Sequence, residues 1–416
     1  MTKRPAVRVV AVVVGLFLVS MLAVSLVVKR AGLESLIVEQ AKIAVGADVT
    51  LEAVSVNWWG GLGLVLHEVS VQGSGEKLTH RPGLAAELGD SGLGDSGLGD
   101  YSGTFSKVVL KIGLVDLFQG VYAPCTAHFE GATLMAAVSG DHLTMSNFEI
   151  DLTNLAYESK TPALSDLSSF DFELNCSEYA GQNTKWADVG LSGSWQEKQL
   201  RVPQLSAYLE DGQITADLLL DWQNEGPGNI SGTLRLFDVP SVPLLSPHWP
   251  RLGQRLRCAL RGEVVGSMSL GDPAERRKSL DLTFSLSAEA GVLDANIWLQ
   301  EATPYLGDRQ DLKVVAFEHL KHEAQIIGGR YGVNTLLITG SDTDWNIAGW
   351  LEFEGNLMLA AKVRLPAGFT PELGSMAFLA EMMRDQDGRV NLAANVTGPT
   401  AAPIVTPDIK QMLRGH

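Results

Sequence analysis

The sequence predicts a mainly β protein built of antiparallel strands, with one transmembrane helix at the N-terminus and a short amphipathic helix near the C-terminus. Three observations carry this prediction. Apolar and polar residues alternate with a period of two along much of the chain. An uncharged run, Val9 to Val28, precedes the alternating part. Apolar residues recur at helical spacing in residues 371–385.

The N-terminal run is long enough to cross a membrane. About 20 residues at a rise of ~1.5 Å span roughly 30 Å, the thickness of a hydrocarbon core. The apolar part of a cleaved signal peptide is usually only about 7–15 residues long, so an uncleaved anchor is favoured over cleavage near Ala23–Ser25. Basic residues are more numerous before the run than after it. This bias predicts a single-pass inner-membrane protein with its N-terminus inside and residues 31–416 in the periplasm.

Composition narrows the class of protein. The chain has 32 basic and 48 acidic residues, a net charge of −16, with 45% hydrophobic and 19% charged residues. This mixture argues against disorder. The first thirty residues contain five basic residues and no acidic residue. The rest of the chain therefore holds 27 basic and 48 acidic residues, a net charge of −21. A body this acidic repels phosphate backbones, so no nucleic-acid partner is expected. Three cysteines are too few for a disulfide framework or a thiolate metal site.

Two stretches show the strand pattern most clearly. In the first, Leu280, Leu282, Phe284 and Leu286 alternate with polar residues, which gives one dry and one wet face. In the second, residues 205–222, a two-residue Asp211-Gly212 turn would place both apolar sets on one face.

A further hairpin is predicted at residues 347–365. Four apolar residues of this hairpin lie at odd positions: Leu351, Phe353, Leu357 and Leu359. Because both arms have the same parity, the loop between them must contain an odd number of residues, as Glu354-Gly355-Asn356 would provide. Together with the residues 280–286 named above, these four are candidates for lining an apolar groove. Other expected strands are Val49–Val56, Leu62–Val71, Lys107–Leu114, Ala132–Val138, Gly232–Phe237 and Val390–Val396, and residues 32–45 are expected to be helical.

The remaining motifs give no catalytic constellation. The tandem SGLGD repeat at residues 88–100 predicts a flexible loop, and its GDSG strings lack the base and rigid oxyanion hole that a nucleophilic serine needs. His319 and His322 would share a helix face, but the sequence specifies no third metal ligand, so a solvated loop or helix surface is favoured. The sequences Asp342–Asp344 and Asp385–Gly388 are expected in β-turns. We therefore expect no enzyme activity, no metal and no cofactor.

Two terminal stretches resemble AsmA-like proteins. Val49–Val71 combines a strand, a Gly-Leu-Gly-Leu break and a second strand, and Leu379–Leu413 contains "GRVNL" followed by "VTGP" and "PIVTPD". The resemblance implies a periplasmic body, anchored in the inner membrane of a Gram-negative bacterium, that forms a long curled antiparallel sheet with a chorein-like N-terminal part. It also implies that the sheet forms an apolar groove that carries phospholipids in support of outer-membrane biogenesis.

The expected organisation has five parts. These are a transmembrane anchor (1–30), a chorein-like β region (31–75), the SGLGD loop (76–104), a β-sheet body (105–370) and an AsmA C-terminal-like region (371–416). Two functional hypotheses remain open from the residues alone. One is a lipid-handling groove, and the other is a membrane-anchored structural or interaction module made of β-sandwiches, because both bury one face of each strand.

Overall fold

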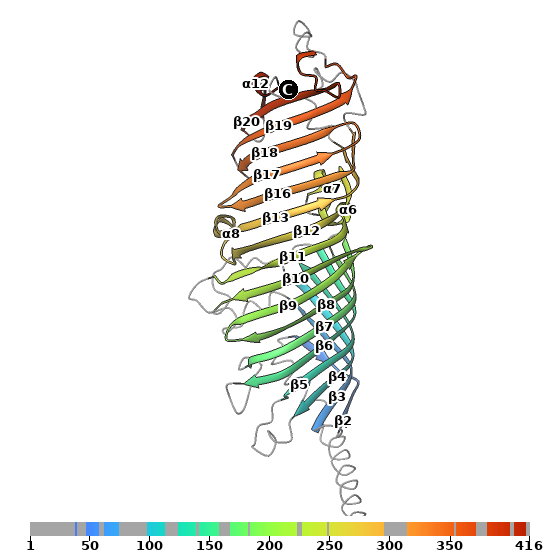
Figure 1. Cartoon of the computed structure of the whole chain (residues 1–416). Coiled ribbons are helices and arrows are strands. Elements are labelled where there is room, and N and C mark those ends of the chain that lie inside the picture. The colour runs from blue at the N-terminus through green and yellow to red at the C-terminus, as the bar shows by residue number, and fades with distance from the viewer. Residues whose placement is uncertain are drawn as a thin grey trace, which may run out of the picture. The chain divides into compact units, whose positions relative to one another are not determined.

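The structure is a computed structural model, and its chain divides into two compact units, Met1–Val202 (unit 1) and Pro203–His416 (unit 2). Each unit is described by itself (Figure 1). The structure describes residues 38–39, 47–57, 62–74, 98–112, 124–138, 141–157, 167–181, 184–222, 227–247, 249–294, 314–352, 355–371, 381–399 and 403–412.

Unit 1 is an antiparallel sheet whose strands pair mostly in chain order. Its strands are β1 (Asp48–Thr50), β2 (Ala53–Asn57), β3 (Leu62–Ser74), β4 (Leu98–Ile112), β5 (Thr126–Val138), β6 (Asp141–Tyr157), β7 (Leu167–Gly181) and β8 (Thr184–Gln196). Both β1 and β2 pair with β3, and each later strand up to β8 pairs with the next. Among the described residues no pairing joins β1 or β2 to β8, so this sheet is not closed.

Several strands of unit 1 are bent by residues with a left-handed backbone. The positive φ angles lie at Glu68 (50°) in β3, Gly131 (63°) in β5, Asn147 (48°) and Asn154 (54°) in β6, and Asp188 (45°) in β8. The register of the β5–β6 and β6–β7 pairs shifts near these positions, as expected for β-bulges, which increase strand twist and bend the sheet. The side chains inside the bend are tightly packed, with Phe148 and Ala132 completely buried.

The first strand of unit 2 is β9 (Gln199–Leu209). Its residues up to Val202 belong to unit 1 and the rest to unit 2. Its other strands are β10 (Gly212–Asp221), β11 (Asn229–Pro240), β12 (Leu256–Ser269), β13 (Asp281–Ala288), β14 (Gly291–Asp294), β15 (Val314–Phe317), β16 (His319–Ile327), β17 (Arg330–Thr339), β18 (Asp344–Glu352), β19 (Asn356–Ala367), β20 (Arg389–Pro399) and β21 (Ile404–Pro407). The main sheet runs β9 to β13, then β16 to β21, and its neighbouring strands from β10 to β21 pair in antiparallel fashion. Figure 1 shows these strands stacked in that order.

Two small additions cover the ends of this sheet. β14 and β15 form a ribbon that pairs with the first residues of β12, and its Leu293, Val315 and Phe317 pack with Ala288, Leu320 and Ile338 of the main sheet. At β19 and β20, a second cluster contains Leu365, Phe369, Met383, Val390, Ala393 and Met412, the last from α12 (Ile409–Met412).

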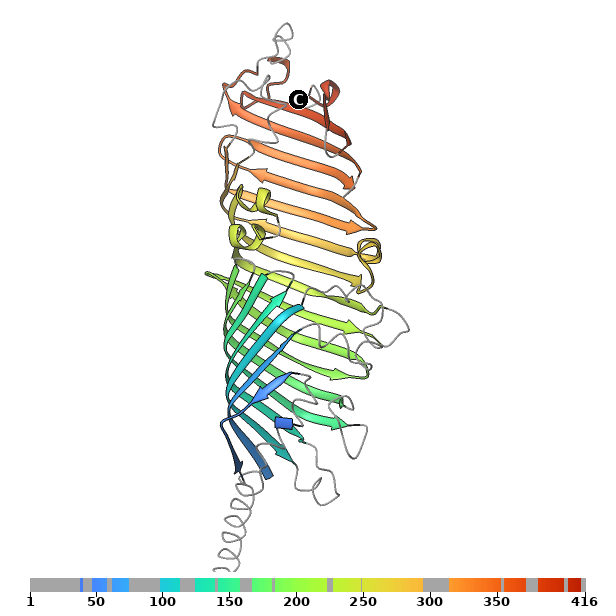
Figure 2. The same cartoon turned by 180° about the vertical axis from the view of Figure 1, so that it is seen from behind.

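Three short helices lie at the strand ends of unit 2. α6 (Ser241–Leu245) and α7 (Pro250–Gly253) form the connection from β11 to β12. α8 (Pro273–Ser279) connects β12 to β13 and begins at Asp272, whose carboxylate accepts a hydrogen bond from the Glu275 backbone N–H. Figures 1 and 2 place α8 and the pair α6–α7 at opposite ends of the strands.

The mainly β, antiparallel class is confirmed, as is the strand at 281–288. All six of the other expected strand segments overlap an observed strand. Two turns lie one residue earlier than predicted. The first turn occupies Glu210 and Asp211 rather than Asp211-Gly212, and the positive φ falls on Glu210 (54°). Gly212 instead begins β10, where a side chain would meet the Val239 Cα at 2.4 Å.

In the second hairpin, Leu351 pairs with Leu357 and the strands end at Glu352 and begin again at Asn356. The loop therefore has three residues, the odd number that the parity argument required, but it starts at residue 353 rather than 354. β4 also begins at Leu98, so the last three residues of the SGLGD repeat belong to a strand rather than to a loop.

Several predictions concern segments outside the described residues. These include the anchor Val9–Val28, most of the helix expected at 32–45, the first part of the SGLGD repeat, and Phe353. Of the amphipathic helix expected at 371–385, only Glu381 and Met382 are described as helical, and residues 372–380 lie outside the described residues. Within the described ranges, no helix combines the length and the apolar character needed to span a bilayer.

Candidate functional site

The main sheet of unit 2 carries a continuous apolar face, formed by three rows of side chains that run across nine strands. The rows follow the pairing registers of β10–β13 and β16–β20, so each member pairs with the next. The middle row is Ala216, Leu234, Val264, Phe284, Ala324, Val333, Gly349, Leu359 and Val396. The flanking rows are Leu218, Gly232, Gly266, Leu282, Ile326, Tyr331, Leu351, Leu357 and Gly398, and Ile214, Leu236, Gly262, Leu286, His322, Leu336, Ile347, Ala361 and Ala394. We call these three rows the apolar face.

The middle of the apolar face stays partly exposed, whereas its ends are covered. Leu234, Val264, Phe284 and Leu359 all keep part of their surface in contact with solvent. The second layers found over this face in the described part of the unit are the β14–β15 ribbon and the segment that packs Phe369 and Met383 against Leu365 and Val390, and they lie at two borders of the face. A full β-sandwich would bury a residue such as Phe284 under a second sheet. In the described part of unit 2, Leu234, Val264, Phe284 and Leu359 therefore stay partly open to solvent, while Ala324 and Val333 of the same row are buried.

The structure brings most of the candidate groove-lining residues onto this face. Leu282, Phe284 and Leu286 of β13 and Leu351, Leu357 and Leu359 of β18 and β19 all belong to the three rows. One row connects the two sets directly, through Ile326 and Tyr331. Leu280 lies just before β13 as the C-cap residue of α8, and it is partly exposed. Phe353 lies outside the described residues.

Only two side chains of the apolar face carry a polar atom, and they bind each other. His322 Nε2 and the Tyr331 hydroxyl form a hydrogen bond, and His322 Nδ1 lies 3.3 Å from the Thr335 carbonyl oxygen. A carbonyl only accepts, so Nδ1 carries the proton and Nε2 accepts from Tyr331. Burial lowers the pKa of His322, partly offset by the Thr335 hydrogen bond, and burial raises the pKa of Tyr331 to about 12. Both side chains are therefore neutral at pH 7.

This arrangement corrects the prediction for His319 and His322. Both lie on strand β16, not on a loop or helix, and their odd spacing places them on opposite faces of the sheet. His319 is exposed, and His322 belongs to the apolar face. In the part of the chain that the structure describes, no group of three His, Cys, Asp or Glu side chains could hold a metal ion. Cys125, Cys176 and Cys258 are all free thiols.

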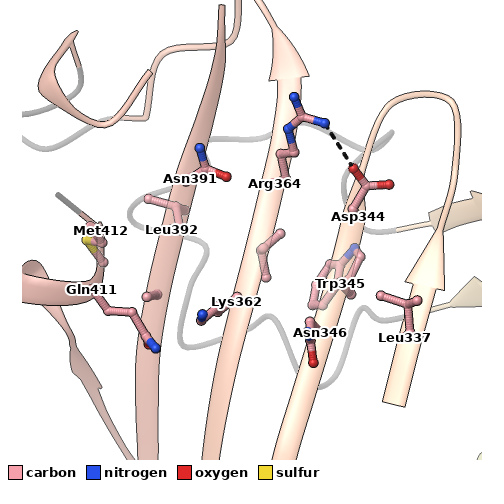
Figure 3. A pocket seen from close by; sticks show the side chains of 12 residues that line it. Leu337, Asp344, Trp345, Asn346, Lys362, Arg364, Asn391, Leu392, Gln411 and Met412 are labelled. Atoms are coloured by element: carbon pink, nitrogen blue, oxygen red, sulfur yellow. Dashed lines mark ion pairs between the residues drawn. The ribbon is translucent and has the colours of Figure 1, made fainter. Parts of the chain in front are cut away.

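A pocket lies near the C-terminal end of the sheet, mainly on the face opposite the apolar face (Figure 3). It encloses about 500 Å³ between β17–β20 and α12. Its lining is mixed, with Leu337, Trp345, Val363, Leu392, Ala393 and Met412 beside Asp344, Asn346, Lys362, Arg364, Asn391 and Gln411. Such a lining suits a local hydration site better than a long hydrocarbon chain.

Next to this pocket is an ion-pair network that the sequence analysis missed. The Arg364 guanidinium donates to Asp385 at 2.6 Å and to Asp387 at 2.5 Å, and Asp344 lies within 3.7 Å of Arg364 and 3.2 Å of Arg389. Burial alone would raise the pKa of Asp385, but hydrogen bonds from Arg364 and from two backbone N–H groups lower it by more. The network holds the predicted turn at Asp385–Gly388, in which the Gly388 N–H donates to the Asp385 carbonyl. No motif signalled it, because the partners meet only through strand pairing.

The opposite face of the sheet carries cross-strand ion pairs beside exposed apolar side chains such as Phe237, Val265 and Met358. Arg235 of β11 lies between Asp217 of β10 and Glu263 of β12, at 3.6 and 3.1 Å. Arg261 of β12 pairs in the same way with Asp238 and Glu289. The two faces of the sheet thus differ sharply, as the alternation in the sequence predicted.

Unit 1 has a corresponding apolar side. One of its rows, Leu66, Val108, Phe129, Ile150, Leu174 and Leu191, crosses β3 to β8. Comparisons of the chain with family models, with curated proteins and with solved structures find no match.

Proposed function

We propose that this protein is a non-enzymatic, membrane-anchored envelope protein that holds the acyl chains of phospholipids against the apolar face and so supports outer-membrane biogenesis. The observation that carries the proposal is the partly exposed middle of the apolar face. A continuous surface of apolar side chains that no second layer covers is the kind of surface that binds a partner of the same chemistry.

The dimensions of the face suit an acyl chain. Nine strands at a spacing of roughly 4.8 Å give a length of about 38 Å. One leaflet of a hydrocarbon core is about 15 Å thick, so the face exceeds the length of a single acyl chain. Each methylene removed from water contributes about 0.8 kcal/mol, so a chain of some 15 methylenes against a surface that covers half of it gains on the order of 6 kcal/mol.

The sequence supports the cellular setting of this proposal. The run Val9–Val28 suits an anchor in the inner membrane, and the charge bias suits a body in the periplasm. The resemblance of Val49–Val71 and Leu379–Leu413 to AsmA-like proteins points to phospholipid as the ligand. A surface without specific polar contacts would take acyl chains of different kinds.

Native mass spectrometry of the full chain, extracted from its membrane, tests the proposal. We expect copurified phospholipid in the wild type. Phe284→Asp places a carboxylate in the middle row, where partial exposure lets it stay hydrated, so the protein should remain folded while bound lipid falls. Ser285→Asp, on the polar face of the same strand, is the matched control and should retain lipid. A lipid-free wild type would contradict the proposal.

One observation favours a second candidate, a membrane-anchored structural or interaction module. The β14–β15 ribbon packs on the main sheet as a small second layer, as in a β-sandwich. If this packing were the purpose of the apolar face, the purified protein would carry no lipid. Phe284→Asp would then bury an unpaired carboxylate and unfold the unit.

A further inference from the structure

The connection between β11 and β12 differs in charge from the rest of the protein. Residues 241–257 contain three arginines and no acidic residue, whereas the other residues hold 29 basic against 48 acidic side chains, a net charge of −19. The connection contains α6 and α7 and their flanking residues, and we call residues 241–257 the α6–α7 hairpin. It is a basic segment on a strongly acidic chain.

The hairpin also exposes apolar side chains. Trp249, between the two helices, is 61% exposed, and Val242 of α6 is 38% exposed. Arg257, at the end of the hairpin, is exposed, and in the described part of the chain no acidic side chain forms an ion pair with it. A tryptophan beside basic residues is typical of protein surfaces that sit at the interface between water and lipid headgroups.

The exposed tryptophan is held in place by the backbone. The Trp249 N–H donates to the Leu245 carbonyl at 2.6 Å, and the Trp249 carbonyl accepts from Gly253 at 2.9 Å. The base of the hairpin is fixed to β12 through Ser241, whose hydroxyl donates to the Leu256 carbonyl at 2.6 Å and accepts from the Cys258 N–H at 2.9 Å. These hydrogen bonds fix the backbone of the hairpin on both sides of Trp249, so the backbone needs little ordering on contact with a partner.

We propose that the α6–α7 hairpin docks onto an anionic phospholipid bilayer, with the Trp249 indole at the level of the headgroups and the exposed Arg257 guanidinium facing the lipid phosphates. This inference rests on the proposed function, because docking would bring the apolar face of the same unit to its source or destination of lipid. Charge complementarity selects a lipid surface over an acidic protein, since only the bilayer also offers an apolar layer beneath its charges.

Vesicle capture by the full chain tests the docking. The protein is placed in nanodiscs of zwitterionic lipid, immobilised, and exposed to phosphatidylcholine vesicles with or without about 30% phosphatidylglycerol. The wild type should retain the anionic vesicles, and added salt should release them. Trp249→Ala and Arg257→Glu should each weaken capture about tenfold, since each removes one of the two contributions to interfacial binding.

Matched controls separate docking from general effects of charge and stability. Lys278→Glu makes the same charge change in α8, at the opposite end of the strands, and should leave capture unchanged. Trp249→Phe should restore part of the capture lost in Trp249→Ala. Equal capture of zwitterionic vesicles, or equal losses in Lys278→Glu and Arg257→Glu, would overturn the proposal.

The outcome of vesicle capture can be interpreted separately from the outcome of the test for copurified lipid. Copurified phospholipid without vesicle capture rejects the docking and leaves the proposed function standing. Capture of anionic vesicles by a lipid-free protein supports the docking and rejects the proposed function.

Discussion

Unit 1 and unit 2 use the same strand pattern but treat their apolar sides differently. In unit 1, Phe105 packs against Phe129 and Phe148 with ring centroids 5.5 and 5.8 Å apart, and Phe148 is completely buried. In unit 2, Phe284 has Tyr331 as its ring neighbour at 6.3 Å and remains partly exposed. Apart from glycine, four described strand residues of unit 1 have a positive φ angle (Glu68, Asn147, Asn154 and Asp188), whereas Asp238 is the one such residue described in the strands of unit 2. Sharper bending lets a sheet cover its own apolar side.

The first prediction compares a charge at the centre of each unit and has the largest expected effect. Phe148→Asp buries an unpaired carboxylate among Ala132 and Cys176, so it should cost at least about 4 kcal/mol of unfolding free energy. Phe284→Asp should cost about 1–2 kcal/mol, because its carboxylate keeps contact with water. Urea denaturation of the full chain in detergent measures both. Equal losses would show that the two apolar sides are equally closed.

The second prediction concerns the closed C-terminal border of unit 2. Arg364→Met removes the charged donor to Asp385 and should lower the unfolding free energy by about 2–3 kcal/mol. The folded pKa of Asp385 is lowered, so its stabilisation is complete above the ordinary carboxyl pKa and is lost as the pH falls through the folded value. The variant should therefore lose less stability in acid than the wild type does.

A control for this prediction is Arg330→Met. Arg330 pairs with Glu352 at 3.0 Å on the solvent-exposed polar face, so its loss should cost under about 1 kcal/mol. If Arg364→Met and Arg330→Met lower the unfolding free energy by the same amount, the network around Arg364 does not stabilise the C-terminal border of unit 2.

The third prediction tests whether positive φ angles produce the bend of unit 1. Asn147 has a φ of 48° and is exposed, so Asn147→Val forces a β-branched residue into a left-handed conformation and should cost about 1–2 kcal/mol. Asn147→Gly should be nearly neutral. Asn346→Val, on an exposed position of an ordinary strand in unit 2, should also be neutral or slightly stabilising, because β-branched residues favour strands. Thermal unfolding compares the three. If Asn147→Val leaves the stability unchanged, the positive φ angle at Asn147 does not explain the bend of unit 1.

Sequence alternation predicted the strands and their faces because period-two patterning depends only on neighbouring residues. The turn at Glu210 was wrong by one residue because the space at Gly212 is set by Val239, on another strand. The bends at Glu68 and Asp188 had no signal, since neither residue type requires a positive φ. The network of Arg364 with Asp385 stayed hidden for a similar reason. Its partners are 21 residues apart and meet only once β19 pairs with β20.

His322 was placed on a helix or loop because its local sequence is rich in charge, and only the sheet register reveals its position on the apolar face. The residue also distinguishes the two units, because the row of unit 1 described above contains no ionisable side chain. His322 therefore offers a local probe of how far water reaches the apolar face of unit 2.

The last prediction uses this probe and has the smallest expected effect. Burial lowers the folded pKa of His322, so the unfolded chain takes up a proton first as the pH falls. The stabilisation is complete above the ordinary histidine pKa and declines as the pH falls from there to the lowered folded value. His322→Gln should flatten the dependence of the unfolding free energy on pH in this window. If His322→Gln leaves this pH dependence unchanged, water reaches the His322 side chain freely in the folded chain, and the centre of the apolar face is hydrated.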